Sequence, residues 1–391
     1  MIELEQAIDI LVKNSKKICE VEEKNLLDSI GKISAENIFA KFDNPPFKRS
    51  PLDGYALNSV ETPNNFKIVG EECAGDFWSK TLQNGETLRI MTGAAIPEGA
   101  DCVIRQEDII KLDDENIFVP KKLNHHENFC FNGEDIKKNS LLVEKYQKIS
   151  AYHIAILASQ GISSVKVFCQ PKIAIVSTSD ELLNLDEKIS AGKIFNSNLY
   201  LLAARLIEFG FSPKILGILP DDVDFTSKKI LEIQNDIDLL ITTGGVSVGK
   251  KDILHDVIKN IGEKIFWRVK MKPGSPVIGW KTDKFLGISL SGNPFAAFAT
   301  FELIARPIIA EISYRNDIFY KRSEGILQNN FNKKSHGRRF IRAIFDNGKI
   351  FLPDNHQSGN FFSAKNCNSF VDIPANSDEL KIGDKVEVIL L

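Results

Sequence analysis

The sequence contains no apolar run long enough to cross a membrane. A transmembrane helix needs roughly 20 consecutive apolar residues, and no stretch of the 391-residue chain reaches that length. The first residues, MIELEQAIDILVKNSKK, lack the basic start and the apolar centre of a signal peptide. We therefore expect a cytoplasmic protein that has no membrane partner.

Paired cysteines and a strong net charge are also lacking. The six cysteines are scattered and form no CxxC pair, which argues against a zinc site and against a disulfide framework. His125 and His126 are adjacent, and in an extended segment adjacent side chains point to opposite faces, so we expect no metal site there. The formal net charge of −3 gives no overall attraction to nucleic acid. Any anion must therefore be bound by local groups.

What the chain does contain is a change of apolar pattern along its length, and we expect four domains. An amphipathic helix begins residues 1–43, which together with 136–168 form an elongated N-terminal, linking domain. Short apolar runs between Gly, Asn and Asp clusters predict a small β-domain over 44–135. Residues 169–316 form an α/β domain, and 317–391, with the hairpin signal Asn-Gly, form a C-terminal β-domain.

The α/β stretch points to a ligand site. Predicted strands alternate with helices, a pattern that favours a mostly parallel sheet with helices on both faces. Ligands of such sheets bind beyond the carboxyl ends of the strands. Five polar turns follow predicted strands, namely STSDEL, LPDD, TTGGVSVGKKD, KPGSP and SGNP. Their convergence on one edge predicts a binding site.

The glycine-rich turn has the residue types of an anion site. Gly244, Gly245 and Gly249 allow backbone N–H groups to approach an anion, and Ser247 adds a donor. The turn is not a Walker loop, because no hydroxyl residue follows its lysine. The glycines are equally compatible with a tight strand-to-helix connection.

Acidic residues in these turns would repel a phosphate. They are Asp180, Glu181, Asp221, Asp222 and Asp252. A bridging Mg²⁺, which takes one or two carboxylates together with water and substrate phosphate, explains them jointly. Helix N-capping explains Asp180, Asp222 and Asp252 equally well, because each precedes a predicted helix. Both interpretations stay open.

Taken together, the motifs resemble the MoeA/gephyrin E-domain family, the molybdopterin molybdenumtransferases. The resemblance runs through nearly the whole chain and rests on SPLDGYAL, RIMTGAAIPEGAD, NGEDI, STSDEL, LPDD, TTGGVSVGKKD, KMKPGSP and SGNP. It implies an elongated four-domain protomer with a molybdopterin-binding α/β domain, assembled as a homodimer. The implied reaction is Mg²⁺-dependent insertion of molybdate into adenylylated molybdopterin with release of AMP. An upstream molybdopterin adenylyltransferase is an implied partner.

Site residues are also implied by this resemblance. Catalytic roles fall on Asp53, Thr92, Asp135, Glu181 and Asp252, and the metal ligands are Glu181, Asp221, Asp222 and Asp252. The implied substrate contacts include four residues of the glycine turn. The whole set is Gly244, Gly245, Ser247, Gly249, Arg268, Lys272, Ser291, Pro294, Arg342 and Ser358.

The sequence departs from the family pattern at several of these positions. Arg268 replaces a lysine, Ser275 replaces a second cation, and Ser291 replaces a proline. QSGN stands where the family has QGSG, which unsettles the assignment of Ser358. None of the changes touches the acidic residues.

Two further functions stay open: a non-catalytic pterin carrier or scaffold, and a nucleotide hydrolase on the same fold. The sequence does not distinguish molybdate from tungstate.

Overall fold

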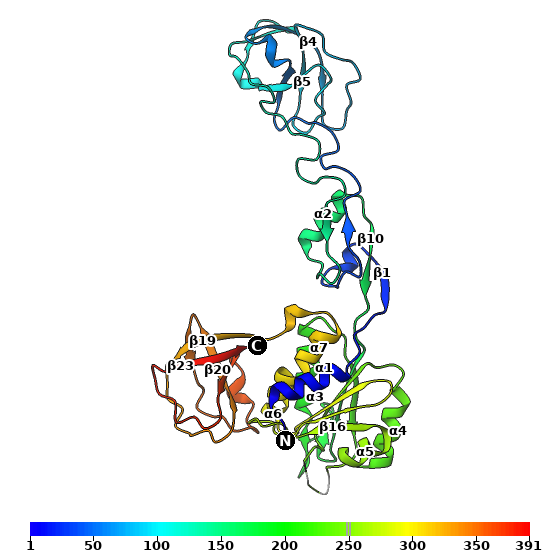
Figure 1. Cartoon of the computed structure of the whole chain (residues 1–391), viewed down its shortest axis with the longest axis vertical. Helices are drawn as coiled ribbons and strands as arrows, with labels where there is room; N and C mark the ends of the chain where they lie inside the picture. The colour runs from blue at the N-terminus through cyan, green and yellow to red at the C-terminus, as the bar shows by residue number, and fades with distance from the viewer. Residues whose placement is uncertain (248, 250–251) are drawn as a thin grey trace. The chain divides into compact units, whose positions relative to one another are not determined.

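The computed structural model describes residues 1–247, 249 and 252–391. The chain divides into two compact units, one formed by Met1–Glu22 with Phe168–Leu391 and the other by Glu23–Val167. Figure 1 labels the elements of both. Within the described ranges, no helix combines the length and the apolar character that a membrane span requires.

The first unit is built around a six-stranded sheet of order β14-β11-β15-β18-β17-β16. The strands are β11 (Ile173–Thr178), β14 (Lys214–Leu219), β15 (Leu239–Thr243), β16 (Glu263–Trp267), β17 (Ile278–Lys281) and β18 (Leu286–Leu290). The strands β14, β11, β15 and β18 run parallel to one another, whereas β17 runs antiparallel to both of its neighbours, β18 and β16. The mostly parallel sheet is as predicted, and β17 is the strand that the apolar pattern did not reveal.

Helices cover both faces of this sheet, as the alternating pattern predicted. Ile173 and Ile175 of β11 face a core shared with α1 (Leu4–Asn14), α3 (Ser197–Glu208), α6 (Pro294–Thr300) and α7 (Arg306–Ile312). Ala174 and Val176, which point the other way because side chains alternate along a strand, pack with α4 (Val223–Ile233) and α5 (Leu254–Ile261). A π-helical segment, Phe301–Ala305, joins α6 to α7.

The first helix of the chain belongs to this unit, and not with residues 136–168 as the sequence led us to expect. Leu4, Ala7 and Leu11 of α1 are fully buried in the core that contains α7. They recur every three to four residues, so the helix presents one apolar stripe. That stripe is buried in the core that the α/β domain shares with residues of the C-terminal barrel.

The C-terminal residues form a small closed barrel of order β19-β21-β20-β22-β23. Its strands are β19 (Lys321–Leu327), β20 (Arg339–Asp346), β21 (Lys349–Phe351), β22 (Ser369–Ile373) and β23 (Lys385–Leu390). The predicted Asn347-Gly348 hairpin connects β20 to β21, and both turn residues have positive φ, 48° and 79°. Phe370 of the barrel packs edge-to-face on Phe295 of α6 at 5.7 Å, which joins the barrel to the α/β core.

The second unit contains a six-stranded sheet of order β6-β3-β5-β4-β8-β7. The strands are β3 (Gly54–Leu57), β4 (Asn64–Glu72), β5 (Glu86–Ile90), β6 (Cys102–Arg105), β7 (Ile110–Lys111) and β8 (Asn116–Val119). A separate small core surrounds α2 (Ala151–Ser159), with β2 (Ile38–Phe39) paired to β9 (Leu141–Val143) and β1 (Val21–Asn25) paired to β10 (Ser164–Phe168).

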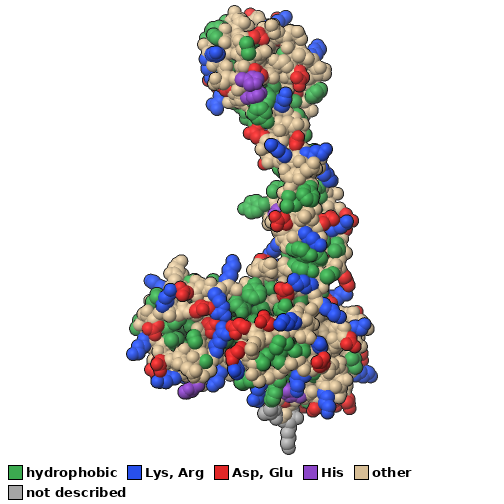
Figure 2. All heavy atoms as spheres, in the orientation of Figure 1, with side chains coloured by type: hydrophobic (Ala, Val, Ile, Leu, Met, Phe, Trp, Pro, Cys, Tyr) green, Lys and Arg blue, Asp and Glu red, His purple; other side chains and the backbone are tan. Residues whose placement is uncertain are grey.

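Charges of both signs are interspersed on the visible face of the molecule. On the face shown in Figure 2, Lys and Arg side chains lie beside Asp and Glu throughout. This distribution agrees with the small net charge of −3.

Candidate functional site

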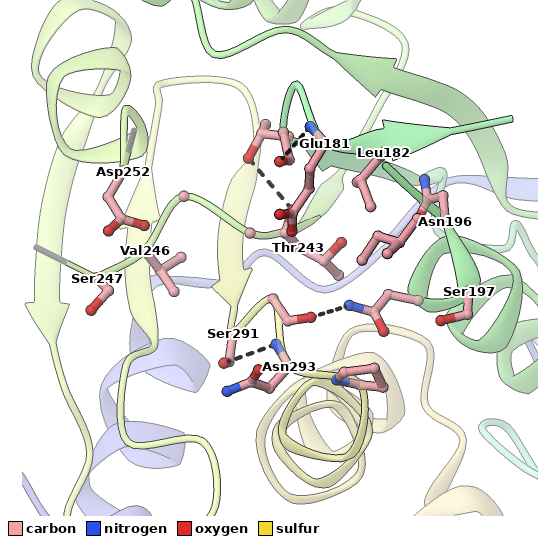
Figure 3. Close-up of a pocket in the computed structure, with 18 of the residues that line it drawn as sticks. Glu181, Leu182, Asn196, Ser197, Thr243, Val246, Ser247, Asp252, Ser291 and Asn293 are labelled. Atoms are coloured by element: carbon pink, nitrogen blue, oxygen red, sulfur yellow. Dashed lines mark hydrogen bonds between the residues drawn. The ribbon is translucent and has the colours of Figure 1, made fainter. Parts of the chain in front are cut away.

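A cavity of about 470 Å³ lies at the carboxyl edge of the sheet. The turns after β11, β14, β15 and β18 all contribute to its wall, and Pro276 of the KPGSP turn does as well. The strand β16 that precedes this turn is antiparallel to β17 and therefore parallel to β18. The five turns therefore meet at one edge of the sheet, as predicted (Figure 3). The volume falls within the range of small-molecule sites, about 300–1,000 Å³.

The turn after β15 needs glycine at its first two positions. Gly244 and Gly245 have φ of 89° and 66°, a region that side-chain-bearing residues rarely adopt. A Cβ on Gly244 would lie 2.4 Å from the carbonyl oxygen of Thr178. The turn can therefore lie directly against β11, and this places Val246 and Ser247 in the cavity wall.

Three carboxylates line the cavity: Glu181, Asp221 and Asp252. Glu181 is exposed, and Asp221 and Asp252 are half-buried. The Asp221 carboxylate accepts a hydrogen bond from the N–H of Asp180 at 3.2 Å, and Asp180 accepts one from the N–H of Asp221 at 3.1 Å. This reciprocal pair fixes the turns after β11 and β14 against each other. Of the acids that the resemblance implied, these three are brought together.

Helix capping was one of two interpretations of Asp180, Asp222 and Asp252, and in the structure it applies to Asp222. Asp222 is the N-cap of α4 and accepts from the N–H of Phe225 at 2.8 Å, and it does not line the cavity. Asp180 precedes the short strand β12 (Leu182–Leu183) and not a helix. The N-cap of α5 is Ile253, and Asp252 instead accepts from the N–H of Gly249 at 2.6 Å.

This bond also decides the position of Gly249. Its N–H is directed at Asp252, and the residue is absent from the cavity wall. The expected contact between Gly249 and a bound anion stays a prediction. Val248, Lys250 and Lys251 of the same turn lie outside the described residues.

The opposite wall comes from the turn after β18 and from the start of α3 (Figure 3). Ser291 and Pro294, both expected contacts, line the cavity. The side-chain amide of Asn198 donates to the carbonyl of Gly292 at 2.7 Å, so α3 holds this turn in place. Asn196 caps α3 by accepting from the N–H of Leu199 at 3.3 Å.

Several wall residues were missed from the sequence. The amides Asn196 and Asn198 and the aromatic Phe195 stand in GKIFNSN, just before a predicted helix. An asparagine at a helix start is usually a cap, so this segment gave no separate signal of a site. The short parallel pairing of β12 with β13 (Ile194–Phe195) is what brings it to the cavity.

Besides Gly249, four expected contact residues do not line the cavity: Arg268, Lys272, Arg342 and Ser358. Lys272 is exposed. Its backbone bonds to the barrel at the start of β20: its N–H donates to the carbonyl of Arg338, the residue before that strand, and its carbonyl accepts from the N–H of Phe340. Among the described residues, no Lys or Arg side chain contributes to the cavity wall.

Arg342 is fully buried inside the barrel domain. Its guanidinium donates to the carbonyls of Gln357 at 2.8 Å and of Asn360, and to the Ser363 hydroxyl at 2.7 Å. Burial lowers the pKa of Arg342 to about 10. All of these acceptors belong to one loop, so Arg342 holds that loop and does not reach the cavity.

The same loop touches α6 through Ser358. The Ser358 carbonyl accepts from the N–H of Phe295 at 3.0 Å, and the Arg342 guanidinium lies 3.5 Å from the centroid of the Phe295 ring. Phe295 directly follows Pro294 of the cavity wall. Arg342 and Ser358 therefore support the wall from behind.

The remaining expected residues lie in the Glu23–Val167 unit. Asp53 accepts hydrogen bonds of 2.7 Å from both the N–H and the hydroxyl of Thr92. These bonds hold the pKa of Asp53 below its ordinary value, and the bond from the backbone N–H has the larger effect. Asp135 accepts from the Asn44 amide at 3.1 Å.

The two adjacent histidines do not point apart as expected. The rings of His125 and His126 lie 3.7 Å apart, centroid to centroid, because the positive φ of His126, 64°, breaks the extended alternation. His125 is paired with Asp101 at 2.6 Å. Within the described part of the chain, no group of three or more His, Cys, Asp or Glu side chains is placed to hold a metal by itself.

Three protein-family models match successive parts of the chain. They are the MoeA N-terminal region (domain I and II) over residues 2–161, the probable molybdopterin binding domain over 174–311, and the MoeA C-terminal region (domain IV) over 324–391.

Curated relatives align over most of the chain. The molybdopterin molybdenumtransferase of Staphylococcus aureus strain Mu50 is 35% identical over 375 residues, which is 93% of this chain and 89% of that protein. The protein of the same name from Staphylococcus epidermidis strain RP62A is 32% identical and covers 100% and 95%. Among solved structures, the molybdopterin biosynthesis MoeA protein from Pyrococcus horikoshii matches with a TM-score of 0.89 at 28% identity, covering 100% of this chain and 99% of that one.

Proposed function

Because this chain belongs to the MoeA family, we propose that it is a molybdopterin molybdenumtransferase that inserts molybdate into adenylylated molybdopterin and releases AMP. The observation that carries the proposal is the composition of the cavity wall. Three carboxylates stand beside two bare backbone turns, and no described cation lines the wall. A phosphate-bearing substrate would be repelled there unless N–H groups and a metal cation balanced its charge.

The wall residues have separate tasks in this reaction. The backbone of the glycine turn would bind the phosphate that links the pterin to AMP, since N–H groups of such a turn favour anions. Asn198 would keep the opposite turn in place through Gly292, so that Ser291 faces the same substrate. The apolar side chains of Leu182, Val246 and others on the wall would exclude water from the reacting groups.

Mg²⁺ is the cofactor that we propose for this site, and the donor set fits it. Mg²⁺ is usually held by one or two protein carboxylates, with water and substrate phosphate in its other positions. Glu181, Asp221 and Asp252 supply such carboxylates, whereas Asp222 is occupied as a helix cap. When bound, the ion would offset the negative charge of the phosphate and the molybdate.

We also propose that the protein acts as a homodimer, with Asp53 completing the site of a partner subunit. Asp53 and Thr92 form an exposed pair in the Glu23–Val167 unit, whereas the cavity belongs to the other unit. Mixing an inactive Asp53→Ala subunit with an inactive Asp252→Ala subunit should restore part of the activity, because one mixed site would be intact. A monomeric mass at micromolar concentration, with no complementation, would contradict the dimer.

The proposed function is tested by AMP release. The protein is incubated with adenylylated molybdopterin and Mg²⁺, and with molybdate, tungstate or neither. AMP that forms only with an oxyanion supports the transferase, and the ratio of the two rates gives its oxyanion preference. AMP that forms with neither oxyanion indicates a nucleotide hydrolase. Tight pterin binding without AMP release indicates a carrier or scaffold.

A further inference from the structure

The glycine turn is held from its core side by an aromatic side chain. Trp267, the last residue of β16, donates its indole N–H to the carbonyl of Val246 at 3.1 Å. Trp267 does not line the cavity, whereas Val246 and the next residue, Ser247, both do. The turn therefore has one face toward the cavity and one face toward the Trp267 ring.

The orientation of the peptide groups follows from these bonds. In a trans peptide, the C=O and the N–H point in opposite directions across one plane. The carbonyl of Gly245 accepts from the N–H of Leu254 at 3.2 Å, and the carbonyl of Val246 accepts from Trp267. The N–H groups that share these peptide planes belong to Val246 and Ser247, so both point away from the core. No described residue accepts a hydrogen bond from either of them.

We propose that Trp267 is a positioning residue, which holds the Val246 carbonyl so that the N–H of Ser247, beside that of Val246, is aimed at a phosphate group of the substrate. The inference rests on the proposed function, because it assumes a phosphate in this cavity. Successive N–H groups that point the same way form an anion-binding concavity. The residues that carry the two N–H groups line the cavity wall beside the second glycine of the turn, Gly245.

The tryptophan is itself fixed in place. The His255 ring meets the Trp267 ring nearly perpendicularly, 86° at 4.8 Å between centroids. The Arg268 guanidinium lies over the indole, 4.3 Å from its centroid. Arg268, which the sequence suggested as a substrate contact, thus packs on the residue that orients the turn. A phenylalanine at position 267 keeps an aromatic ring in this setting and removes the N–H donor together with one ring of the indole, so a control must lose the same atoms.

The chain offers a matched control for that substitution. Trp280 of β17 is fully buried in the same sheet and donates its indole N–H to the Ser289 hydroxyl at 3.0 Å. Neither Trp280 nor Ser289 lines the cavity. Trp280→Phe therefore makes the same chemical change, and the indole hydrogen bond that it removes does not involve the glycine turn.

The test is calorimetric binding of AMP and of adenosine, neither of which requires turnover. Trp267→Phe should raise the Kd for AMP about five- to twentyfold, the scale of one hydrogen bond, and leave the Kd for adenosine unchanged. Trp280→Phe should change neither Kd.

Equal weakening of AMP and adenosine by Trp267→Phe would overturn the proposal, since it would indicate a general loss of packing. An unchanged AMP affinity would overturn it as well, and failure of the wild type to bind AMP would overturn both this inference and the proposed function. AMP release is measured separately. A chain that binds AMP as expected but inserts no molybdate would refute only the proposed function.

Discussion

Replacing Asp252 by asparagine separates a metal-binding role from a turn-forming role at one position. The Asp252 carboxylate accepts the Gly249 N–H at 2.6 Å and lines the cavity. The amide oxygen of asparagine can accept the same hydrogen bond, so the turn keeps its shape. The negative charge is lost, and an amide is a much poorer ligand for Mg²⁺ than a carboxylate.

The two effects differ in size. A hydrogen bond to a charged group contributes about 1.5–3 kcal/mol to the free energy of unfolding and a neutral one about 1 kcal/mol, so the substitution should cost at most about 2 kcal/mol. A domain stable by about 5–15 kcal/mol stays folded after such a loss. Removal of one electrostatic stabiliser of a transition state lowers the rate on the order of 10²–10³-fold. Activity should therefore fall in a protein that remains folded.

The assay is AMP release against Mg²⁺ concentration, beside thermal unfolding of the same preparations. Raising Mg²⁺ should recover part of the lost rate of Asp252→Asn. Asp222→Asn is the matched control, because asparagine caps a helix about as well as aspartate and Asp222 lies off the cavity wall; it should keep both its activity and its thermal midpoint. Full activity in Asp252→Asn would refute the reasoning and would leave the metal to Glu181 and Asp221.

Two further predictions concern backbone strain and pH. Gly244→Ala should abolish AMP binding and lower the thermal midpoint, because its Cβ would clash with the Thr178 carbonyl oxygen at 2.4 Å. The control is Gly217→Ala, at a glycine with a similar φ of 83° and no neighbour within 4 Å of the added Cβ. This variant should lose only about 1–2 kcal/mol of stability and keep its AMP binding. Burial, followed by the charge of Arg342, lowers the pKa of His356 to about 4. Between pH 6.5 and 4 the unfolded chain therefore binds a proton that the folded chain does not, so the free energy of unfolding should fall by up to about 3 kcal/mol as pH falls. Chemical denaturation at pH 7.5 and 4.5 should show a smaller fall in His356→Gln, and equal falls would contradict this.

The position of the site could be predicted from the sequence, because it follows from strand order and direction. Apolar runs that alternate with amphipathic helices specify a parallel sheet, and the carboxyl ends of its strands meet at one edge. The turns that carry Glu181, Asp221, Ser247 and Ser291 therefore had to converge. The strand β17 escaped prediction because its apolar run is only four residues long and stands between two polar turns.

The roles of individual polar groups in those turns could not be predicted. Asp222 and Asp252 both stand just before a helix in the sequence, yet one accepts the N–H of its own helix and the other accepts the N–H of a glycine in the turn. The difference depends on backbone dihedral angles. Similarly, Arg342 has the residue type of a substrate contact, but its burial among the carbonyls of one loop is visible only in three dimensions.

The burial of α1 has a consequence for the order of folding during synthesis. Leu4, Ala7 and Leu11 pack in a core that also contains Ile304 and Ile308, so the first helix leaves the ribosome long before its partners exist. At roughly 5–20 residues per second, the interval between the two is on the order of 15–60 s. The Glu23–Val167 unit can complete its own cores in that time. Until α7 is made, the apolar stripe of this helix therefore stays uncovered on the nascent chain.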